Sequence, residues 1–149
     1  MFYYDFQIVL QEVPGEISLC FSICGCKLKC NGCHSGHLWT EKNGKILLEQ
    51  FFTETIDKYL DYATCVLFMG GEWYEEELIK LLKIAKTRKY KTCLYTGEEF
   101  ISKELSKELT FLKTGRWKKE LGSLESNKTN QKFIEVQKNK NLNYLFSKY

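Results

Sequence analysis

Four of the seven cysteines in this chain fall within ten residues, and three of them have a spacing that suits an iron–sulfur cluster. Cys26, Cys30 and Cys33 form the pattern C-x3-C-x2-C. Three thiolates on one short loop can hold three irons of a [4Fe-4S] cube and leave the fourth iron open to a substrate. A closed structural cluster would need a fourth cysteine. Cys24 is the nearby candidate, but its C-x-C spacing to Cys26 is tight for two corners of one cube.

Two other uses of these cysteines are weaker. Zinc takes four ligands, which the cysteines of the loop with His34 and His37 could supply. Zinc modules, however, usually separate two ligand pairs by about 12–20 residues, whereas here every candidate lies in one loop. A redox pair of the thioredoxin type, by resemblance, needs a cis-proline later in the chain, and the only proline is Pro14, upstream. The pattern therefore favours iron and sulfur over a zinc-binding interaction module.

Composition narrows the class of protein. The chain has 149 residues, of which 44% are hydrophobic and 28% charged, and this predicts one globular domain spanning residues 1–149. No apolar run approaches the roughly 20 residues of a membrane span, and there is no secretory signal pattern. An odd number of cysteines in such a chain argues against a disulfide framework and for a cytoplasmic location. A net charge of +3 is too small to indicate a nucleic-acid partner.

Apolar runs and helical periodicities alternate along the chain. Apolar runs predict buried strands, and recurrence every three to four residues predicts helices. The expected strands are residues 17–24, 65–69, 92–95, 111–113 and 133–136, with an edge strand near residues 6–10. The expected helices are residues 47–61, 74–88 and 98–109, and residues 25–45 and 115–131 read as long loops. This order predicts an α/β fold with four to five parallel strands, which is an open partial (β/α) barrel because the chain is too short to close one.

Polar or glycine-rich residues follow each of these strands, at the edge where catalytic groups of such folds gather. The first strand leads into the cysteine loop, and the next three lead into Gly70-Gly71-Glu72, Thr96-Gly97 and Lys113-Thr114-Gly115. Glycine lets a ligand approach the backbone closely, and Glu72 adds a negative charge. We therefore expect one shared site. Cys20, Cys65 and Cys93 lie within strands and read as small buried hydrophobic residues.

The motifs together resemble those of radical S-adenosylmethionine (SAM) enzymes, and more narrowly the activating proteins of anaerobic ribonucleotide reductases. The resemblance runs through Gly25-Cys26, Gly32-Cys33-His34-Ser35, Leu38-Trp39, Gly70-Gly71-Glu72, Lys113-Thr114-Gly115 and Thr129-Asn130-Gln131. The broad superfamily usually has an aromatic residue just before the third cysteine, whereas this chain has Gly32, as the reductase activating proteins do. The resemblance implies a [4Fe-4S] cluster on Cys26, Cys30 and Cys33 that cleaves SAM to a 5′-deoxyadenosyl radical.

The resemblance also implies which residues contact SAM and which proteins are partners. Gly70, Gly71 and Glu72 would contact the methionyl amino group, Lys113 the carboxylate, Thr96 the ribose, and Asn130 the adenine or ribose, with Gly32, Cys33 and His34 alongside. The radical would be passed to a glycine of the large subunit of the anaerobic ribonucleotide reductase. The activating protein of another glycyl radical enzyme, of the formate-lyase type, is the alternative. A flavodoxin-like or other reductant would supply the electron.

The C-terminal third of the chain is strongly basic. Residues 103–149 hold 11 basic and 5 acidic groups, whereas residues 1–102 hold 11 basic and 14 acidic groups. Six of the basic residues surround the loop after residue 113, namely Lys113, Arg116, Lys118, Lys119, Lys128 and Lys132. They form either a solvated surface or a positive rim that guides an anionic partner to the site.

Overall fold

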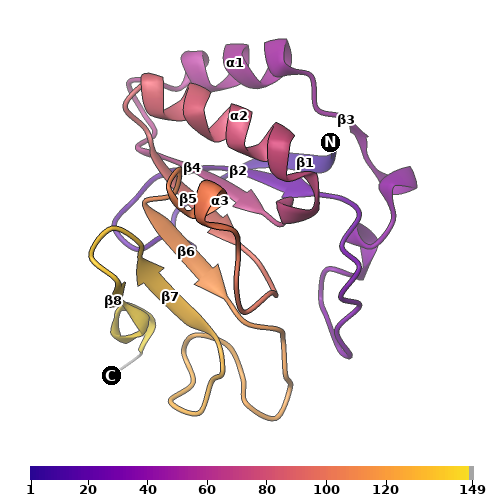
Figure 1. The fold of residues 1–149 in the computed structure, drawn as a ribbon, viewed down its shortest axis with the longest axis vertical. Helices are drawn as coiled ribbons and strands as arrows, with labels where there is room; N and C mark the ends of the chain where they lie inside the picture. The colour runs from indigo at the N-terminus through magenta and orange to yellow at the C-terminus, as the bar shows by residue number, and fades with distance from the viewer. Residues whose placement is uncertain (148–149) are drawn as a thin grey trace.

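A mixed sheet of eight strands, in the order β3-β1-β2-β4-β5-β6-β7-β8, organises residues 1–147, the part of the chain that the computed structural model describes (Figure 1). The strands are β1 (Phe2–Val9), β2 (Ser18–Ile23), β3 (Lys45–Ile46), β4 (Cys65–Met69), β5 (Lys91–Tyr95), β6 (Phe111–Thr114), β7 (Lys132–Glu135) and β8 (Lys140–Asn141). The helices are α1 (Glu49–Lys58), α2 (Glu75–Thr87) and α3 (Lys103–Ser106). Short 3-10 turns are η1 (Gly36–Leu38), η2 (Glu41–Asn43), η3 (Glu72–Tyr74) and η4 (Asn143–Phe146).

Four central strands, β2, β4, β5 and β6, run parallel, because a helix carries the chain back between each pair from β2 to β6. These helices lie on one side of the sheet in Figure 1. α1 buries Phe52 and Ile56, and α2 buries a stripe that includes Leu78 and Leu82, at the spacing of one helix face. The fold is therefore mixed α/β, with an open and partly parallel sheet.

Successive side chains of each strand point to opposite faces of the sheet, so the interior consists of two hydrophobic cores. Side chains such as Phe21 and Phe68 point toward the helices and pack with Phe52, their rings 5.2–5.8 Å apart. The opposite face carries Cys20, Cys65 and Cys93, the three strand cysteines, which are 0–4% exposed. Phe111, Phe133 and Leu124 cover this second face. The strand cysteines thus occupy apolar positions, as their place in the sequence predicted.

The parallel strands number four, which agrees with the predicted four to five. β7, at the expected strand over residues 133–136, pairs antiparallel with β6 because a loop without a crossover helix joins the two. Two other details of the predicted fold are wrong. The helix expected over residues 98–109 shrinks to α3, which begins only where the Ser102 hydroxyl accepts the amide proton of Leu105 at 3.1 Å. The expected edge strand is β1, which pairs with β2 along its length and with β3 through Phe2 and Tyr3. The predicted domain, residues 1–149, includes two residues outside the described ones.

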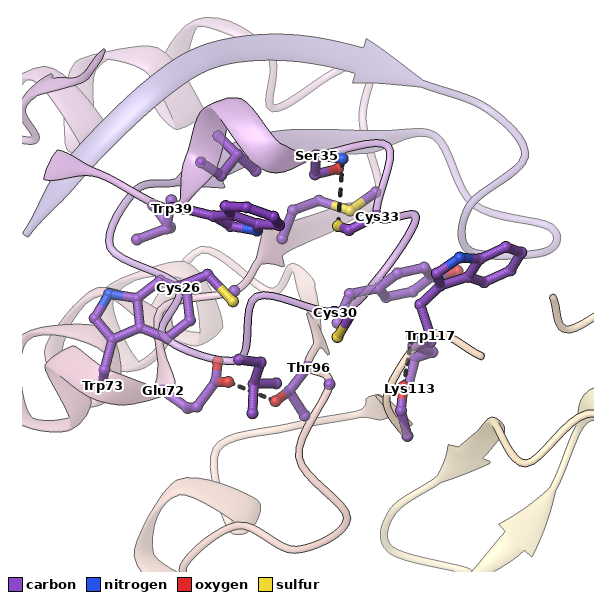
Figure 2. Close-up of a pocket in the computed structure, with 18 of the residues that line it drawn as sticks. Cys26, Cys30, Cys33, Ser35, Trp39, Glu72, Trp73, Thr96, Lys113 and Trp117 are labelled. Carbon is purple, nitrogen blue, oxygen red and sulfur yellow. Dashed lines mark hydrogen bonds between the residues drawn. The ribbon is translucent and has the colours of Figure 1, made fainter. Parts of the chain in front are cut away.

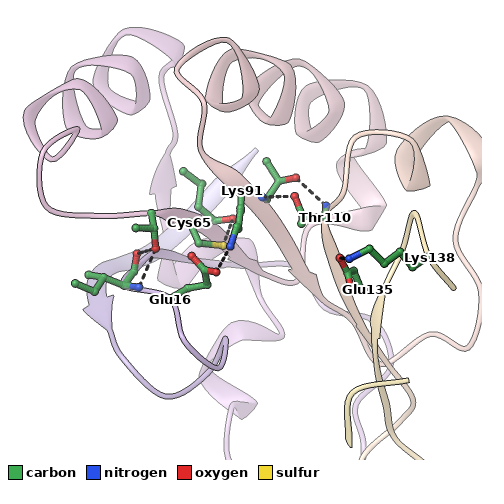
Figure 3. Close-up of polar contacts among 10 residues, drawn as sticks. Glu16, Cys65, Lys91, Thr110, Glu135 and Lys138 are labelled. Atoms are coloured by element: carbon green, nitrogen blue, oxygen red, sulfur yellow. Dashed lines mark hydrogen bonds and ion pairs between the residues drawn. The ribbon is translucent and has the colours of Figure 1, made fainter. Parts of the chain in front are cut away.

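Polar contacts tie the strands together at the end away from the cysteine loop, at the starts of β4, β5 and β6 (Figure 3). Lys91 pairs with Glu16, whose side chain is only 8% exposed. Thr92 and Thr110 exchange hydrogen bonds, each amide donating to the other hydroxyl at 3.1 Å. The contacts at this end of the sheet join neighbouring strands and stabilise the fold. The opposite end, where the cysteine loop lies, is available for a functional site. No helix within residues 1–147 is both long and apolar enough to pass through a membrane.

Candidate functional site

The C-terminal ends of the parallel strands open onto one pocket beside the cysteine loop (Figure 2). Its lining includes Cys26, Cys30 and Cys33, the three motif cysteines. It also includes residues that follow the next three strands, namely Gly70, Glu72, Thr96, Gly97, Lys113 and Gly115. Residues more than 80 positions apart in the sequence meet here because parallel strands end at the same edge of the sheet. The shared site expected from the strand ends is present.

Backbone hydrogen bonds shape the cysteine loop. The amides of Gly25 and Cys26 both donate to the carbonyl of Leu38, at 2.7 and 3.1 Å, and so close residues 25–38 into a loop. Within it, the Cys33 amide donates to the Cys30 carbonyl at 3.1 Å. Gly32 lies inside this tight turn with φ of +72°, a conformation that favours glycine. The loop therefore holds Cys30 and Cys33 at the two ends of one turn.

The three motif cysteines fit a cluster by their exposure and their arrangement. All are half-buried, whereas the strand cysteines are buried. In Figure 2 their side chains surround one cavity instead of converging on a single point. Among residues 1–147, no three His, Cys, Asp or Glu side chains are gathered to hold a metal ion. Ligands of one zinc ion converge to about 2.3 Å from it, whereas a cube takes each thiolate at a different iron corner.

Backbone amides surround the motif cysteines as hydrogen-bond donors. The Ser35 amide donates to the Cys33 Sγ at 3.3 Å. Burial raises the pKa of the Cys26 thiol, and hydrogen bonds from the backbone of Leu28 and Lys29 act in the opposite direction. Amide donors of this kind stabilise thiolates, the form in which cysteine binds iron. The donor set therefore suits a cluster that is held by three cysteines.

Cys24 lies outside the pocket. It is fully buried, and its amide donates to the Phe2 carbonyl at 2.8 Å. Its sulfur packs against Gly44, where an added Cβ would lie 2.8 Å from the Cys24 Sγ. The Cys24 side chain thus fills the interior beside β1, and its position does not suit a fourth ligand.

Glu72 and Lys113 place opposite charges in the same pocket. The Thr96 hydroxyl donates to the Glu72 Oε1 at 2.6 Å, while the Glu72 Oε2 is buried without a hydrogen-bond partner. Burial raises the pKa of Glu72, which the Thr96 hydrogen bond partly offsets. Burial lowers the pKa of Lys113 to about 8, against the influence of Cys30, Cys33 and Glu72. An unpaired carboxylate oxygen and a buried amine in one cavity can receive the ammonium and the carboxylate of an amino acid.

Two glycines bring the backbone close to the pocket. Gly70 has φ of +80°, and a Cβ there would lie 2.6 Å from the Trp73 Cη2. A Cβ at Gly97 would lie 2.5 Å from the Leu28 Cδ1. Gly70 favours glycine because of its positive φ and its contact with the Trp73 ring, whereas the Leu28 side chain at Gly97 is flexible and could shift.

Other residues expected to contact SAM lie farther from the cavity. Gly71 packs against Ile23, and Gly32 lines a neighbouring groove instead. The His34 side chain is exposed, with its ring 5.9 Å from that of Trp117. Asn130 donates to the Arg116 carbonyl at 3.0 Å and lines a separate depression with Glu98. The Thr96 hydroxyl already bonds Glu72 and the Glu98 amide, so its predicted contact with a ribose would compete with these partners.

Comparison with known families decides the kind of centre. A family model described as a 4Fe-4S single cluster domain matches residues 14–145. The chain belongs to the 4Fe-4S single cluster domain family. Domains of this family are typical of radical SAM glycyl radical activases, and most are radical SAM enzymes. No curated protein and no solved structure matches the chain.

The match supports a [4Fe-4S] cluster as the cofactor of this 4Fe-4S single cluster domain. It covers the cysteine loop and all four parallel strands. The choice of Cys26, Cys30 and Cys33 as ligands rests on their spacing, their half-buried thiols and their common pocket.

Sequence analysis missed the apolar wall of this domain's pocket. Leu28, Trp39, Trp73, Tyr95 and Trp117 all line it, together with Gln131. The sequence pattern identified Trp39 only as part of the Leu38-Trp39 motif, and it gave no role to Trp73. A signal was present for Trp117, because an aromatic residue in the polar loop over residues 115–131 has no strand or helix of its own to bury it.

Proposed function

We propose that this chain is a radical SAM activase with an open partial barrel that binds SAM in the pocket beside its cluster. The motif cysteines would hold three irons and leave the fourth for the amino and carboxylate groups of SAM. When bound, the reduced cluster supplies one electron that cleaves SAM to methionine and a 5′-deoxyadenosyl radical, which takes a hydrogen atom from a glycine of the target. The cluster then needs one electron from an external reductant, of the flavodoxin type or another, for each SAM cleaved.

One observation carries the proposal: Glu72 and Lys113, a carboxylate and an amine that are both half-buried, line the same cavity as the motif cysteines. The unpaired Glu72 Oε2 is an acceptor for an N–H of the methionyl amino group, and Lys113 is a cation for the methionyl carboxylate. The apolar wall formed by Leu28, Trp39 and Tyr95 would exclude water from a reactive intermediate. The residues of this chain thus bind, orient and shield, and the cofactor carries out the bond cleavage.

We propose the large subunit of an anaerobic ribonucleotide reductase as the target. Gly32 before the third cysteine supports this choice over an activase of the formate-lyase type. An open side of the sheet suits a peptide loop of a large protein as substrate. No nucleic acid or membrane partner is part of the proposal.

A basic groove next to the cysteine loop supports docking of an acidic partner. Lys29, Arg116, Lys118 and Lys119 line it, together with Cys30, Asn31, Gly32, Trp117 and Glu120. The loop after β6 thus borders the same cysteine loop as the cavity does. A positive groove here would guide an anionic protein toward the cluster, and its effect should weaken with salt.

The proposal is tested with a triple variant, Arg116→Glu, Lys118→Glu and Lys119→Glu. We expect it to slow formation of the glycyl radical on a purified anaerobic reductase, measured by electron paramagnetic resonance (EPR), and to leave SAM cleavage without the reductase nearly unchanged. The control triple variant carries glutamate at Lys58, Lys83 and Lys103, which are exposed on the three helices. Equal loss with both variants would refute docking in the groove. Radical formation on a formate-lyase-type enzyme alone would refute the choice of target.

A further inference from the structure

The loop after β6 holds one half-buried tryptophan among exposed residues. Trp117 is half-buried, whereas Arg116, Lys118 and Lys119 on either side are exposed. The Trp117 Nε1 is buried and has no hydrogen-bond partner. A buried donor without a partner destabilises the fold, because it loses its hydrogen bond to water and gains none in return. Contacts within the protein therefore leave the N–H of this side chain without an acceptor.

The Trp117 Nε1 lies against the turn that joins two motif cysteines. A Cβ built on Gly32 would be 3.6 Å from this nitrogen, and Gly32 lies inside the turn between Cys30 and Cys33. Trp117 also lines the pocket that contains all three motif cysteines (Figure 2). The nitrogen is thus held beside the cysteine loop, out of water, at the edge of the pocket.

Trp73 in the same pocket provides a comparison. Its Nε1 donates to the Cys24 carbonyl at 3.0 Å, so its hydrogen-bonding capacity is met by the protein. An indole N–H is a donor only, and it therefore needs an acceptor. For Trp117 the described residues supply no acceptor, and a group bound in the pocket could supply one. Thiolates and bridging sulfides of a cluster are acceptors, and they would lie at the Cys30–Cys33 turn.

We propose that Trp117 is a positioning residue whose indole N–H donates a hydrogen bond to a sulfur of the cluster beside Cys30 and Cys33. The proposal rests on the cluster of the proposed function and is independent of SAM cleavage and of the target. Hydrogen bonds to the sulfurs and exclusion of solvent both set the reduction potential of an iron–sulfur centre. A donated proton stabilises the added electron, so the bond raises the potential of the cluster.

The test compares reduction potentials of anaerobically reconstituted protein in the absence of SAM, by redox titration followed by EPR. Trp117→Phe keeps an aromatic ring and removes the N–H, and we expect a shift to a more negative potential with iron content unchanged. Trp117→Ala should shift the potential and also speed bleaching by air. Trp73→Phe removes an N–H that already has a protein acceptor and should leave the potential unchanged. An unchanged potential in Trp117→Phe would overturn the proposal.

A second measurement needs no variant of Trp117. Wild-type protein containing tryptophan labelled with ¹⁵N at the indole nitrogen should give a hyperfine coupling to the reduced cluster in pulsed EPR, and Trp39→Phe and Trp73→Phe should retain it. Absence of the coupling overturns the proposal, even if Trp117→Phe fails to fold. Both measurements need only the cluster. A protein that binds the cluster and fails to cleave SAM would thus refute the proposed function and leave the role of Trp117 open to this test.

Discussion

The hydrogen bond from Thr96 to Glu72 allows a direct test of the charge arrangement in the pocket. Thr96 is 3% exposed, and its hydroxyl donates to the Glu72 Oε1 at 2.6 Å. Because the Glu72 Oε2 has no partner, Thr96→Val leaves both oxygens of a buried carboxylate without a side-chain donor. A hydrogen bond to a charged group contributes about 1.5–3 kcal/mol. We expect Thr96→Val to lower the free energy of unfolding by about 2 kcal/mol at pH 8.

The expected loss depends on pH with a definite sign. Burial holds the pKa of Glu72 above its ordinary value, and the Thr96 hydrogen bond opposes that shift. Removal of the hydroxyl therefore raises the pKa of Glu72 further. The folded variant therefore takes up a proton more readily than the folded wild-type protein. Its deficit, the loss in free energy of unfolding relative to wild type, is largest at pH values where Glu72 is ionised. The deficit shrinks as the pH falls through the raised pKa of Glu72 and the carboxyl becomes protonated.

Urea unfolding of the reduced, cluster-free protein at pH 8 and pH 5 measures this difference. Thr96→Ser keeps the hydroxyl and is the matched control, which should lose much less stability than Thr96→Val at pH 8. A Thr96→Val deficit that is equal at both pH values would refute a charged acceptor at Glu72. A deficit below about 0.5 kcal/mol at pH 8 would refute the hydrogen bond itself.

Three further predictions concern the cysteines. Alanine at any one of the motif cysteines should abolish the cluster absorbance and SAM cleavage, and full iron content in one of these variants would contradict the ligand assignment. Alanine at any one of the strand cysteines should keep the iron and cost only about 1–3 kcal/mol of stability, measured by urea unfolding, whereas Cys24→Ser should keep the cluster. Alkylation of the cluster-free protein at pH 8, followed by mass spectrometry, should label the half-buried motif cysteines before the strand cysteines. Burial raises the pKa of Cys20 and Cys65 to about 12 and that of Cys93 well above its ordinary value, so the strand cysteines are thiols at this pH. Rapid labelling of Cys93 in the native protein would contradict its burial.

The parallel core was predictable because its signals are local. Residues 65–69 form a continuous apolar run, and the structure has β4 with the same bounds. The helical spacing of Leu78, Leu82 and Ala85 likewise predicted α2 to within about a turn. Once parallel strands are inferred, their C-terminal ends must meet, and this predicts that Glu72, Thr96 and Lys113 lie beside the cysteine loop.

Features that depend on tertiary contacts were out of reach. The direction of β7 depends on how a polar loop turns back, and no periodicity in residues 115–131 encodes that. The helix expected over residues 98–109 begins only at Lys103, after the Ser102 cap, and Phe100 before it is 85% exposed and does not pack on the core. The burial of Trp117 depends on the cysteine loop lying beside the loop after β6, two segments about 85 positions apart in the sequence.

Reductive cleavage of SAM tests the central claim most directly. Anaerobically reconstituted protein would be supplied with SAM and a low-potential reductant, and iron, zinc and 5′-deoxyadenosine would be measured on the same sample. We predict about four irons per chain and 5′-deoxyadenosine that forms only when reductant is present. Glu72→Gln should reduce product formation with the iron content unchanged. About one zinc per chain with no 5′-deoxyadenosine would contradict the account and favour a zinc-binding module.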